Sequence, residues 1–274
     1  MAKVARQKSA SAAPSGARQP KKSAARLPET ERAIRHRLTP RAALRGLDDA
    51  AEFLEEMGLL LQTPHPYLPS LFGAAQGKPA KPGVAGFGQW PAHAWSWAGE
   101  LAEREDVLTT KVLLGKRTLV HRRLWKALDS AVRELQPLTP DAEAIVTALR
   151  ARKSVRSDEL PNLAGFEGTL AKKRYHRAMT QLEWSGMVIC APALVDQHKH
   201  VAIAALWSTR FPQPLAKPRG PADFIKATLE AAGPTPEREL VKWCNWPKPG
   251  VQHAVSELVS KGELRLAEGL LIPT

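Results

Sequence analysis

The segment GTLAKKRYHRAMTQLEWSG, residues 168–186, gathers side chains of the kind that contact nucleic-acid phosphates and base edges. Its cationic or titratable basic residues are Lys172, Lys173, Arg174, His176 and Arg177. On a helix, Lys172, Lys173, His176, Arg177 and Thr180 share one side, and the opposite side is apolar: Ala171, Tyr175, Ala178, Met179 and Leu182. This spacing predicts an amphipathic helix whose outer face contacts DNA. A solvated basic face without a partner is the alternative.

Two further groups of basic residues are candidates for phosphate contact. One lies in the segment 111–126, and its candidates are Lys116, Arg117, Arg122 and Arg123. The other is the polar turn QHKH, residues 197–200, where Lys199 lies beside two histidines. Because this turn connects two β-rich runs, it predicts either the wing of a DNA-binding module or a polar turn without contacts.

The net charge of +13 on 274 residues favours a polyanionic partner. Nucleic acid is the first candidate, and an anionic membrane surface is the second. Residues 1–28 hold seven lysines and arginines and no acidic residue, and they contain few large apolar side chains. We expect this segment to be a disordered basic tail, either as a solubilising extension or as an arm that contacts phosphates.

The elements that must position the basic face follow a recognisable order. Thr139 and Pro140 are typical of a helix start, and SDELPNL predicts a second helix capped by Ser157. The helix of residues 168–186 is the third, and MVICAPALV and KHVAIAALW form a hairpin. Three helices followed by a hairpin are the order of a winged helix.

The same order recurs nearer the C-terminus, where helices over PADFIKATLEAAG, TPERELVKWCNW and KPGVQHAVSELVSKG precede two short strands. In the last of these helices we expect Val251, Val255, Leu258 and Val259 to point inward. The N-terminal part predicts helices over LDDAAEFLEEM, with Asp48 or Asp49 as the cap, over WSWAGELAERED and over residues 118–135. The sequence thus predicts a mainly α protein with small β-hairpins, an α+β fold of tandem winged helices. The expected divisions are a tail (1–28), an N-terminal helical or winged-helix-like domain (29–137), a winged helix (138–215) and a C-terminal winged helix (216–274).

Several other classes of chemistry have no support in the sequence. It contains no phosphate-binding loop, no HExxH motif and no GxSxG motif. Cys190 and Cys244 are far apart, which excludes a disulfide scaffold and fits a reducing compartment. No apolar run is long enough to span a membrane. We therefore expect neither cofactor nor metal, and a cytoplasmic, nucleoid-associated location, with an organelle transit peptide as the alternative for the basic N-terminus.

Three stretches together carry a family resemblance: LPSLFGAAQG, AWSWAGELAEREDVLTTKVLLGKRTLVHRRLWKAL and RAMTQLEWSGMVICAPALVDQHKHVAIAALWSTRFP. They resemble the AlkZ/YcaQ-type winged-helix DNA glycosylases, over roughly residues 45–274. The resemblance implies a bacterial protein that binds double-stranded DNA and exposes an alkylated or cross-linked nucleotide for base excision.

The family's catalytic motif is a glutamine followed two residues later by glutamine or aspartate. In LLLQTPHPY, Gln62 matches the first member, but the second position is Pro64, with His65 or His93 as substitutes. The alternatives to an enzyme are a transcriptional regulator and an architectural DNA-binding module that works with an unidentified protein. Trp90, Trp95 and Trp97 are either core residues or a stacking surface for an exposed base.

Overall fold

The computed structural model describes residues 29–79, 90–132, 137–196, 199–217, 220–244 and 246–274. Helices and small antiparallel sheets make up this part of the chain, which confirms the expected α+β class. None of its helices is long and apolar enough to cross a membrane. The expected basic tail, residues 1–28, lies outside the described residues.

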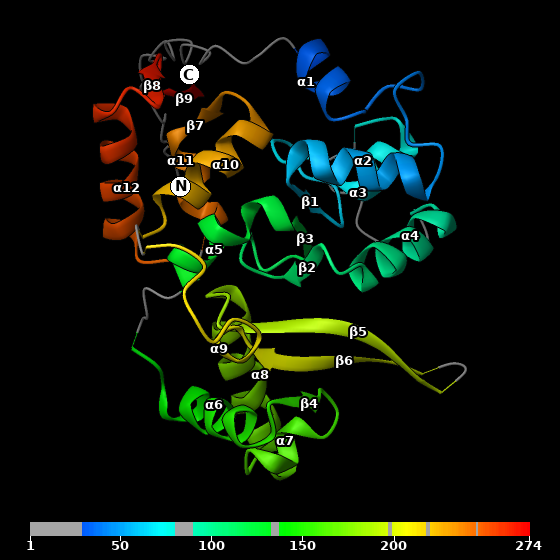
Figure 1. Ribbon diagram of the computed structural model, residues 1–274, viewed down its shortest axis with the longest axis vertical. Coiled ribbons are helices and arrows are strands. Elements are labelled where there is room, and N and C mark those ends of the chain that lie inside the picture. Colours follow the sequence, from blue (N-terminus) through cyan, green and yellow to red (C-terminus); the bar gives the residue numbers. More distant parts are fainter. Residues whose placement is uncertain (1–28, 80–89, 133–136, 197–198, 218–219, 245) are drawn as a thin grey trace, which may run out of the picture.

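One order of elements, helix–strand–helix–helix–strand–strand, occurs three times along the described chain (Figure 1). The first unit consists of α2 (Leu47–Met57), β1 (Leu59–Leu61), α3 (Leu71–Gln76), α4 (Ala92–Glu103), β2 (Val107–Thr110) and β3 (Thr118–His121). The second consists of α6 (Pro140–Arg152), β4 (Ser154–Arg156), α7 (Leu160–Leu163), α8 (Gly168–Trp184), β5 (Val188–Asp196) and β6 (Lys199–Leu206). The third consists of α10 (Ala222–Ala232), β7 (Thr235–Pro236), α11 (Glu237–Trp243), α12 (Lys248–Ser260), β8 (Leu264–Ala267) and β9 (Leu270–Pro273).

The three sheets of the described residues share one topology. In each, the last strand of the unit lies between the other two, in the orders β1-β3-β2, β4-β6-β5 and β7-β9-β8. All pairs are antiparallel. The pair β5–β6 is the longest, from Val188 opposite Leu206 to Asp196 opposite Lys199. It projects from the second unit as an extended hairpin (Figure 1).

The apolar cores join the first and third units more closely than the second. One core contains residues of the first unit, of the third unit and of α5 (Trp125–Val132), which follows the short η2 (Arg122–Leu124), and the second unit contributes Ile189 of β5 to it. A second core lies within the first unit, and a third within the second unit. The helix α1 (Glu29–Arg35) lies beside the third unit, where Arg32 and His36 contact backbone carbonyls of Pro234 and Ala231. The second unit therefore forms a distinct lobe below the other two (Figure 1).

Two residues mark the start of the second unit and the end of α8. Thr139 caps α6, since its side chain accepts a hydrogen bond from the N–H of Ala142, as the Thr-Pro pair predicts. At the other end, Gly186 follows α8 with φ of +80°, and a Cβ there would lie 2.6 Å from Cγ2 of Val132. Glycine is therefore required both by the backbone conformation and by the approach of α5.

Several expected elements differ in the structure. Residues 118–121 were expected to be helical, but they form the central strand β3, and the helical turn begins only at Arg122. The strands β1, β2 and β4 and the helix α3 were not expected at all. Very short elements of this kind leave little periodicity in a sequence, because their stability comes from the neighbours against which they pack.

The expected helix caps and one inward residue also need correction. The residue that precedes α2 is Gly46, and Asp48 and Asp49 lie in its first turn. Ser157 does not cap α7, because its backbone and side chain pair with Ala202 of β6. Val259 is 37% exposed, whereas Ala254 takes the inward place beside Val251, Val255 and Leu258.

Candidate nucleic-acid interface

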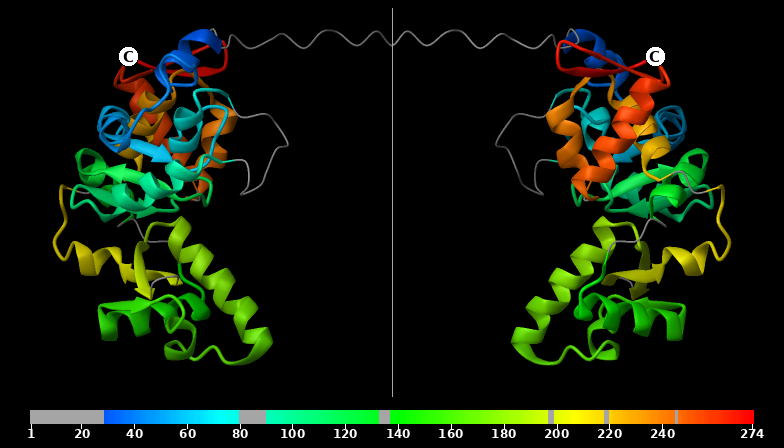
Figure 2. Two further views of the ribbon diagram at one scale, coloured as in Figure 1. Left: turned by 90° about the vertical axis from the view of Figure 1, so that its right-hand side faces the viewer. Right: turned by 90° about the vertical axis from the view of Figure 1, so that its left-hand side faces the viewer.

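The outer face of α8 is the principal candidate surface. Lys172, Lys173, His176 and Arg177 are exposed, and Thr180 is half-buried on the same side. The opposite side is in the core of the second unit, where Tyr175, Ala178, Met179 and Leu182 are buried. The helix runs along one edge of the lobe (Figure 2). The structure thus gives α8 the two faces that its spacing predicts.

Arg174 has a different environment from the other cations of α8. Its guanidinium donates to both carboxylate oxygens of Asp141 on α6, with Nε 3.0 Å from Oδ2. This hydrogen-bonded pair lowers the pKa of the Asp141 carboxyl. Among the described residues, Lys172, Lys173, His176 and Arg177 have no ion-pair partner. Four side chains of this helix therefore keep their positive or titratable groups available.

The C-terminal end of α8 rests on the turn between β2 and β3 of the first unit. The φ of Gly115 in this turn is +64°, and a Cβ on it would lie 2.2 Å from the indole of Trp184. Nearby, Nζ of Lys111 lies 2.6 Å from Oε2 of Glu183. Lys116 and Arg117 are in the same turn, so the structure brings them toward the end of α8. From Trp184, Arg177 is seven residues away, or about 10 Å along the helix axis.

The cations of the first unit are not all available for phosphates. Lys116 is half-buried, its Nζ donates to the carbonyl of Pro64 at 3.3 Å, and burial lowers its pKa. Arg122 and Arg123 are exposed but lie at the other end of β3, away from Lys116 and Arg117. Arg123 Nη2 donates to the carbonyl of Glu56 at 2.7 Å. The structure therefore does not bring Arg122 and Arg123 together with the turn of Lys116 and Arg117.

Gln62 immediately follows β1, and its side chain lies inside the protein. The residue is 5% exposed, and its Nε2 has no hydrogen-bond partner within the described residues. Its backbone N–H donates to the carbonyl of Arg117 at 2.8 Å, and its carbonyl accepts from the N–H of Phe72 at 3.2 Å. Gln62 is thus held between the β2–β3 turn and α3, with a buried amide nitrogen that lacks a partner among the described residues.

His65 follows Gln62 in a partly buried loop. Its Nδ1 lies 3.2 Å from the backbone nitrogens of Tyr67 and Leu68, which act as donors. Its ring is edge-on to Trp243 of α11, with centroids 5.9 Å apart. Burial, followed by the charge of Lys116, lowers the pKa of His65 to about 4. The imidazole is therefore neutral near pH 7 and leaves Nε2 as its N–H donor.

The tryptophans of the first unit pack mainly against its core. Trp95 and Trp90 contact the ring of Phe72, with centroid distances of 4.8 and 5.8 Å. Trp97 is only partly buried and lies against the exposed His93, with centroids 4.6 Å apart. Trp90 and Trp95 thus have a packing role, and His93 is separated in sequence and contacts from the loop of Gln62.

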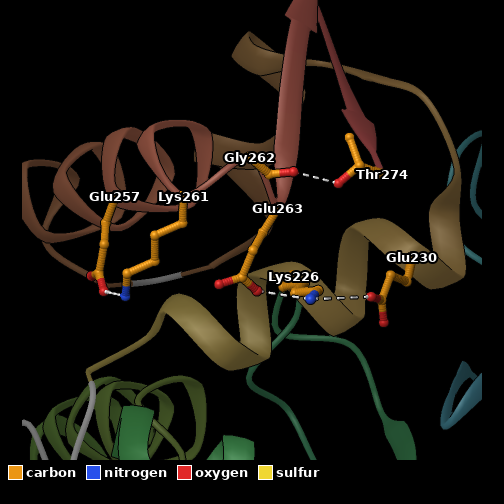
Figure 3. Close-up of polar contacts among 7 residues, drawn as sticks. All are labelled: Lys226, Glu230, Glu257, Lys261, Gly262, Glu263 and Thr274. Carbon is orange, nitrogen blue, oxygen red and sulfur yellow. Dashed lines mark hydrogen bonds and ion pairs between the residues drawn. The ribbon is translucent and has the colours of Figure 1, made fainter.

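The remaining candidates lie in the hairpin tip and the third unit. The side chain of Lys199 and the tip residues 197–198 fall outside the described part of the structure. On α12, Gln252, His253 and Ser256 are exposed, and Glu257 beside them is half-buried. Charged residues of the third unit pair with each other (Figure 3): Lys226 with Glu263 at 2.7 Å and Lys261 with Glu257. Arg238, Lys248 and Arg265 of the third unit are exposed and have no ion pair within the described residues, but they lie on three different elements and do not share one helix face as the cations of α8 do.

The first unit has an acidic hollow of about 300 Å³, which no motif in the sequence predicted. Asp48, Glu52, Glu55 and Asp106 line it, together with Arg104 and His121. Arg104 donates two hydrogen bonds to the carboxylate of Asp106, from Nε to Oδ1 and from Nη2 to Oδ2, each 2.9 Å long. No group of residues suited to holding a metal ion occurs in the described ranges. The acidic charge of this hollow sets it apart from the basic face of α8.

Comparison with known proteins gives one structural and one family match. No curated protein matches the sequence. The DNA glycosylase AlkZ of Streptomyces sahachiroi is similar in structure, with a TM-score of 0.52 and 15% sequence identity, over 89% of this chain and 68% of that chain. This level of identity shows a shared fold. The family model described as "AlkZ related" matches residues 44–202, more than half of the sequence, and the protein therefore belongs to the AlkZ-related family.

Proposed function

We propose that this protein binds double-stranded DNA through winged-helix modules, with the outer face of α8 against the duplex. The observation that carries the proposal is the one-sided array of exposed basic side chains on α8 that have no ion-pair partner within the described residues. Lys172, Lys173 and Arg177 supply phosphate contacts in this arrangement, and His176 and Thr180 supply polar groups for base edges or backbone.

The repeated element order supports winged helices as the modules. Each unit has three helices, a strand after the first helix and a terminal hairpin whose second strand is central. In such modules the third helix enters the major groove, and here the third helices are α4, α8 and α12. We propose module boundaries of 29–137, 138–215 and 216–274. The hairpin β5–β6 is the wing of the central module, with Lys199 near its tip.

The differences among the three third helices favour the central module as the DNA-binding one. The outer side of α4 presents Trp97, His93 and Glu100, and that of α12 presents Gln252, His253 and Ser256. Only on α8, among these three described helices, do three lysine or arginine side chains without ion pairs share the outer face. Arg117, in the turn against which the end of α8 packs, extends the basic surface toward the first unit, whereas the half-buried Lys116 is held by the carbonyl of Pro64.

The test is a titration of a short DNA duplex at several salt concentrations. Phosphate contacts displace counterions, so the logarithm of the association constant falls linearly with the logarithm of the salt concentration. We expect a negative slope of about 0.9 for each phosphate contacted. Binding confined to one duplex sequence would indicate a regulator, and sequence-independent binding would indicate a repair or architectural protein. If the protein does not bind the duplex even at low salt, the proposal is wrong.

Excision of a damaged base is a second candidate function, favoured by family membership and by Gln62. The Nε2 of Gln62 is a buried polar group without a partner in the described part of the chain, a state that proteins usually avoid unless another group binds there. Two features place this function second. The side chain is enclosed by protein, and Pro64 stands where the family motif has glutamine or aspartate.

The excision function is tested with duplexes that carry alkylated or cross-linked bases. After incubation, treatment with alkali converts abasic sites into strand breaks. Excision predicts breaks at the damaged position with the native protein and fewer with Gln62→Ala. If strand breaks are no more frequent than in the duplex incubated without protein, the protein does not excise these bases, and DNA binding remains its proposed function.

A further inference from the structure

Leu170 is the most exposed of the large apolar side chains in the described residues. Its exposed fraction is 80%, compared with 60% for Ile34, 52% for Leu266 and 45% for Leu163. It belongs to the first turn of α8, two residues after the helix begins at Gly168. An apolar side chain of this size therefore stands in solvent at the leading end of the proposed DNA-binding helix.

Leu170 lies on the same side of α8 as the proposed phosphate contacts. Lys173 and Arg177 follow it at three and seven positions, a spacing that places all three on one line along a helix. Tyr175 and Met179, which are buried, lie on the opposite side. Leu170 is thus the apolar first member of a row whose next members are cations.

The residues at the start of α8 are exposed, from Glu167 to Leu170. A Cβ added to Gly165 or to Gly168 would meet no atom of the described structure within 4 Å beyond its chain neighbours and the helix backbone. Acidic side chains close to the leading turns of α8 include Glu167, exposed before its first residue, and Asp141, which Arg174 engages, whereas Glu183 lies at the far end of the helix. The leading turn can therefore approach a large partner with Leu170 in front and Lys173 and Arg177 behind.

We propose that Leu170 contacts the 5-methyl group of a pyrimidine, above all thymine, in the major groove of DNA. This inference rests on the proposed function of α8. Residues in the N-terminal turns of a helix that enters the major groove are those that reach base edges, and the thymine methyl is the apolar group displayed there. The cations behind Leu170 favour a phosphate-flanked partner over an apolar protein surface.

The inference is tested with two duplexes of the same A·T-rich sequence, one of which has uracil in place of every thymine. Uracil lacks only the methyl group, so hydrogen-bonding groups and phosphates are unchanged. For the native protein we expect the duplex with thymine to bind about fourfold more tightly per contacted methyl, as burial of one methyl group implies. For Leu170→Ser we expect this ratio to fall toward one, and Leu170→Met should retain most of it.

Leu266→Ala is the matched control, because it removes an exposed leucine from β8 of the third unit and should keep the native ratio. A native ratio of one, or a ratio that Leu170→Ser leaves unchanged, would overturn the inference. If the proposed function itself is wrong, the protein will bind neither duplex with a salt-dependent affinity. The two failures are therefore distinguishable. Because Leu170 is exposed, its variants should have the same unfolding temperature as the native protein, which a thermal unfolding measurement checks.

Discussion

The indole of Trp207 donates a hydrogen bond of 2.6 Å to the carboxylate of Asp129, and both side chains are buried. Asp129 belongs to α5, and Trp207 begins α9 (Trp207–Arg210) directly after the hairpin of the second unit. The second carboxylate oxygen accepts from the N–H of Leu215 at 2.9 Å. One carboxylate thus ties the chain that leaves the second unit to α5, and so connects the lobe of α8 to the other two units.

Replacement of Asp129 by alanine should destabilise the protein. The indole N–H of Trp207 and the N–H of Leu215 would lose their acceptor in a buried site, at a cost of about 3 kcal/mol. Urea unfolding measures the change in free energy. Glu100→Ala is the control, because Glu100 is exposed and accepts one hydrogen bond from Ser96 on its own helix. Equal losses in the two variants would contradict the role of Asp129.

Removal of two cations from α8 should weaken DNA binding. In Lys172→Ala with Arg177→Ala, two phosphate contacts are lost, so we expect affinity near 0.1 M salt to fall roughly ten- to hundredfold and the salt slope to decrease in magnitude by about two. Fluorescence anisotropy of a labelled duplex measures both quantities.

The control for this variant is Lys242→Ala with Lys261→Ala. It removes the same charge, but Lys242 and Lys261 are paired with Glu239 and Glu257 in the third unit. It should reduce affinity only slightly. A native slope in the α8 variant, or equal effects of the two double variants, would be inconsistent with a DNA-binding face on α8.

Asp141 should limit DNA binding through its contact with Arg174. Because the guanidinium of Arg174 is held by the Asp141 carboxylate, Arg174→Ala should change duplex affinity less than Arg177→Ala. Asp141→Asn removes the negative charge and weakens this contact, so it should increase affinity severalfold. The same anisotropy titration measures both variants. Weaker binding by Asp141→Asn would show that the pair serves to orient α8.

Stability should fall as the pH is lowered below 6.5, because of buried histidines. Burial lowers the pKa of His36 from its ordinary 6.5 to about 4, and the pKa of His65 is lowered similarly. Between these pH values the unfolded chain binds protons that the folded chain does not, so protonation favours unfolding. The loss for His36 alone is up to about 3 kcal/mol.

Urea unfolding at several pH values between about 7 and 4 tests this dependence. His36 Nε2 lies 3.0 Å from the carbonyl of Ala231, and His36→Gln keeps a hydrogen-bond donor there without the titration. This variant should show a flatter dependence on pH, whereas His253→Ala, at an exposed position of α12, should follow the native curve. An unaltered curve for His36→Gln would contradict the assignment.

The sequence predicted α8 and its surroundings well, since the signals there are local. Apolar residues at spacings of three and four identified the buried side of α8, and Thr139 identified the start of α6. The strands β1, β2, β3, β4 and β7 were not predicted. These segments of two to four residues are strands only because a partner strand lies beside them. Thr235–Pro236 was predicted to start a helix, because the Thr-Pro pair is a local helix-start signal and its pairing with β9 leaves no local signal.

For the candidate site, the sequence by itself determined which side chains α8 presents, because helical periodicity fixes which residues share a face. It could not determine which of them are available. The partner of Arg174 is 33 residues away, and Gln62 is enclosed by segments that begin well after it in the chain. Pairing and burial depend on residues that only the tertiary structure brings together. The tertiary structure therefore decided that the other cations of α8 are available whereas Arg174 is paired, that Lys116 is half-buried, and that Arg122 and Arg123 lie at a distance from this face.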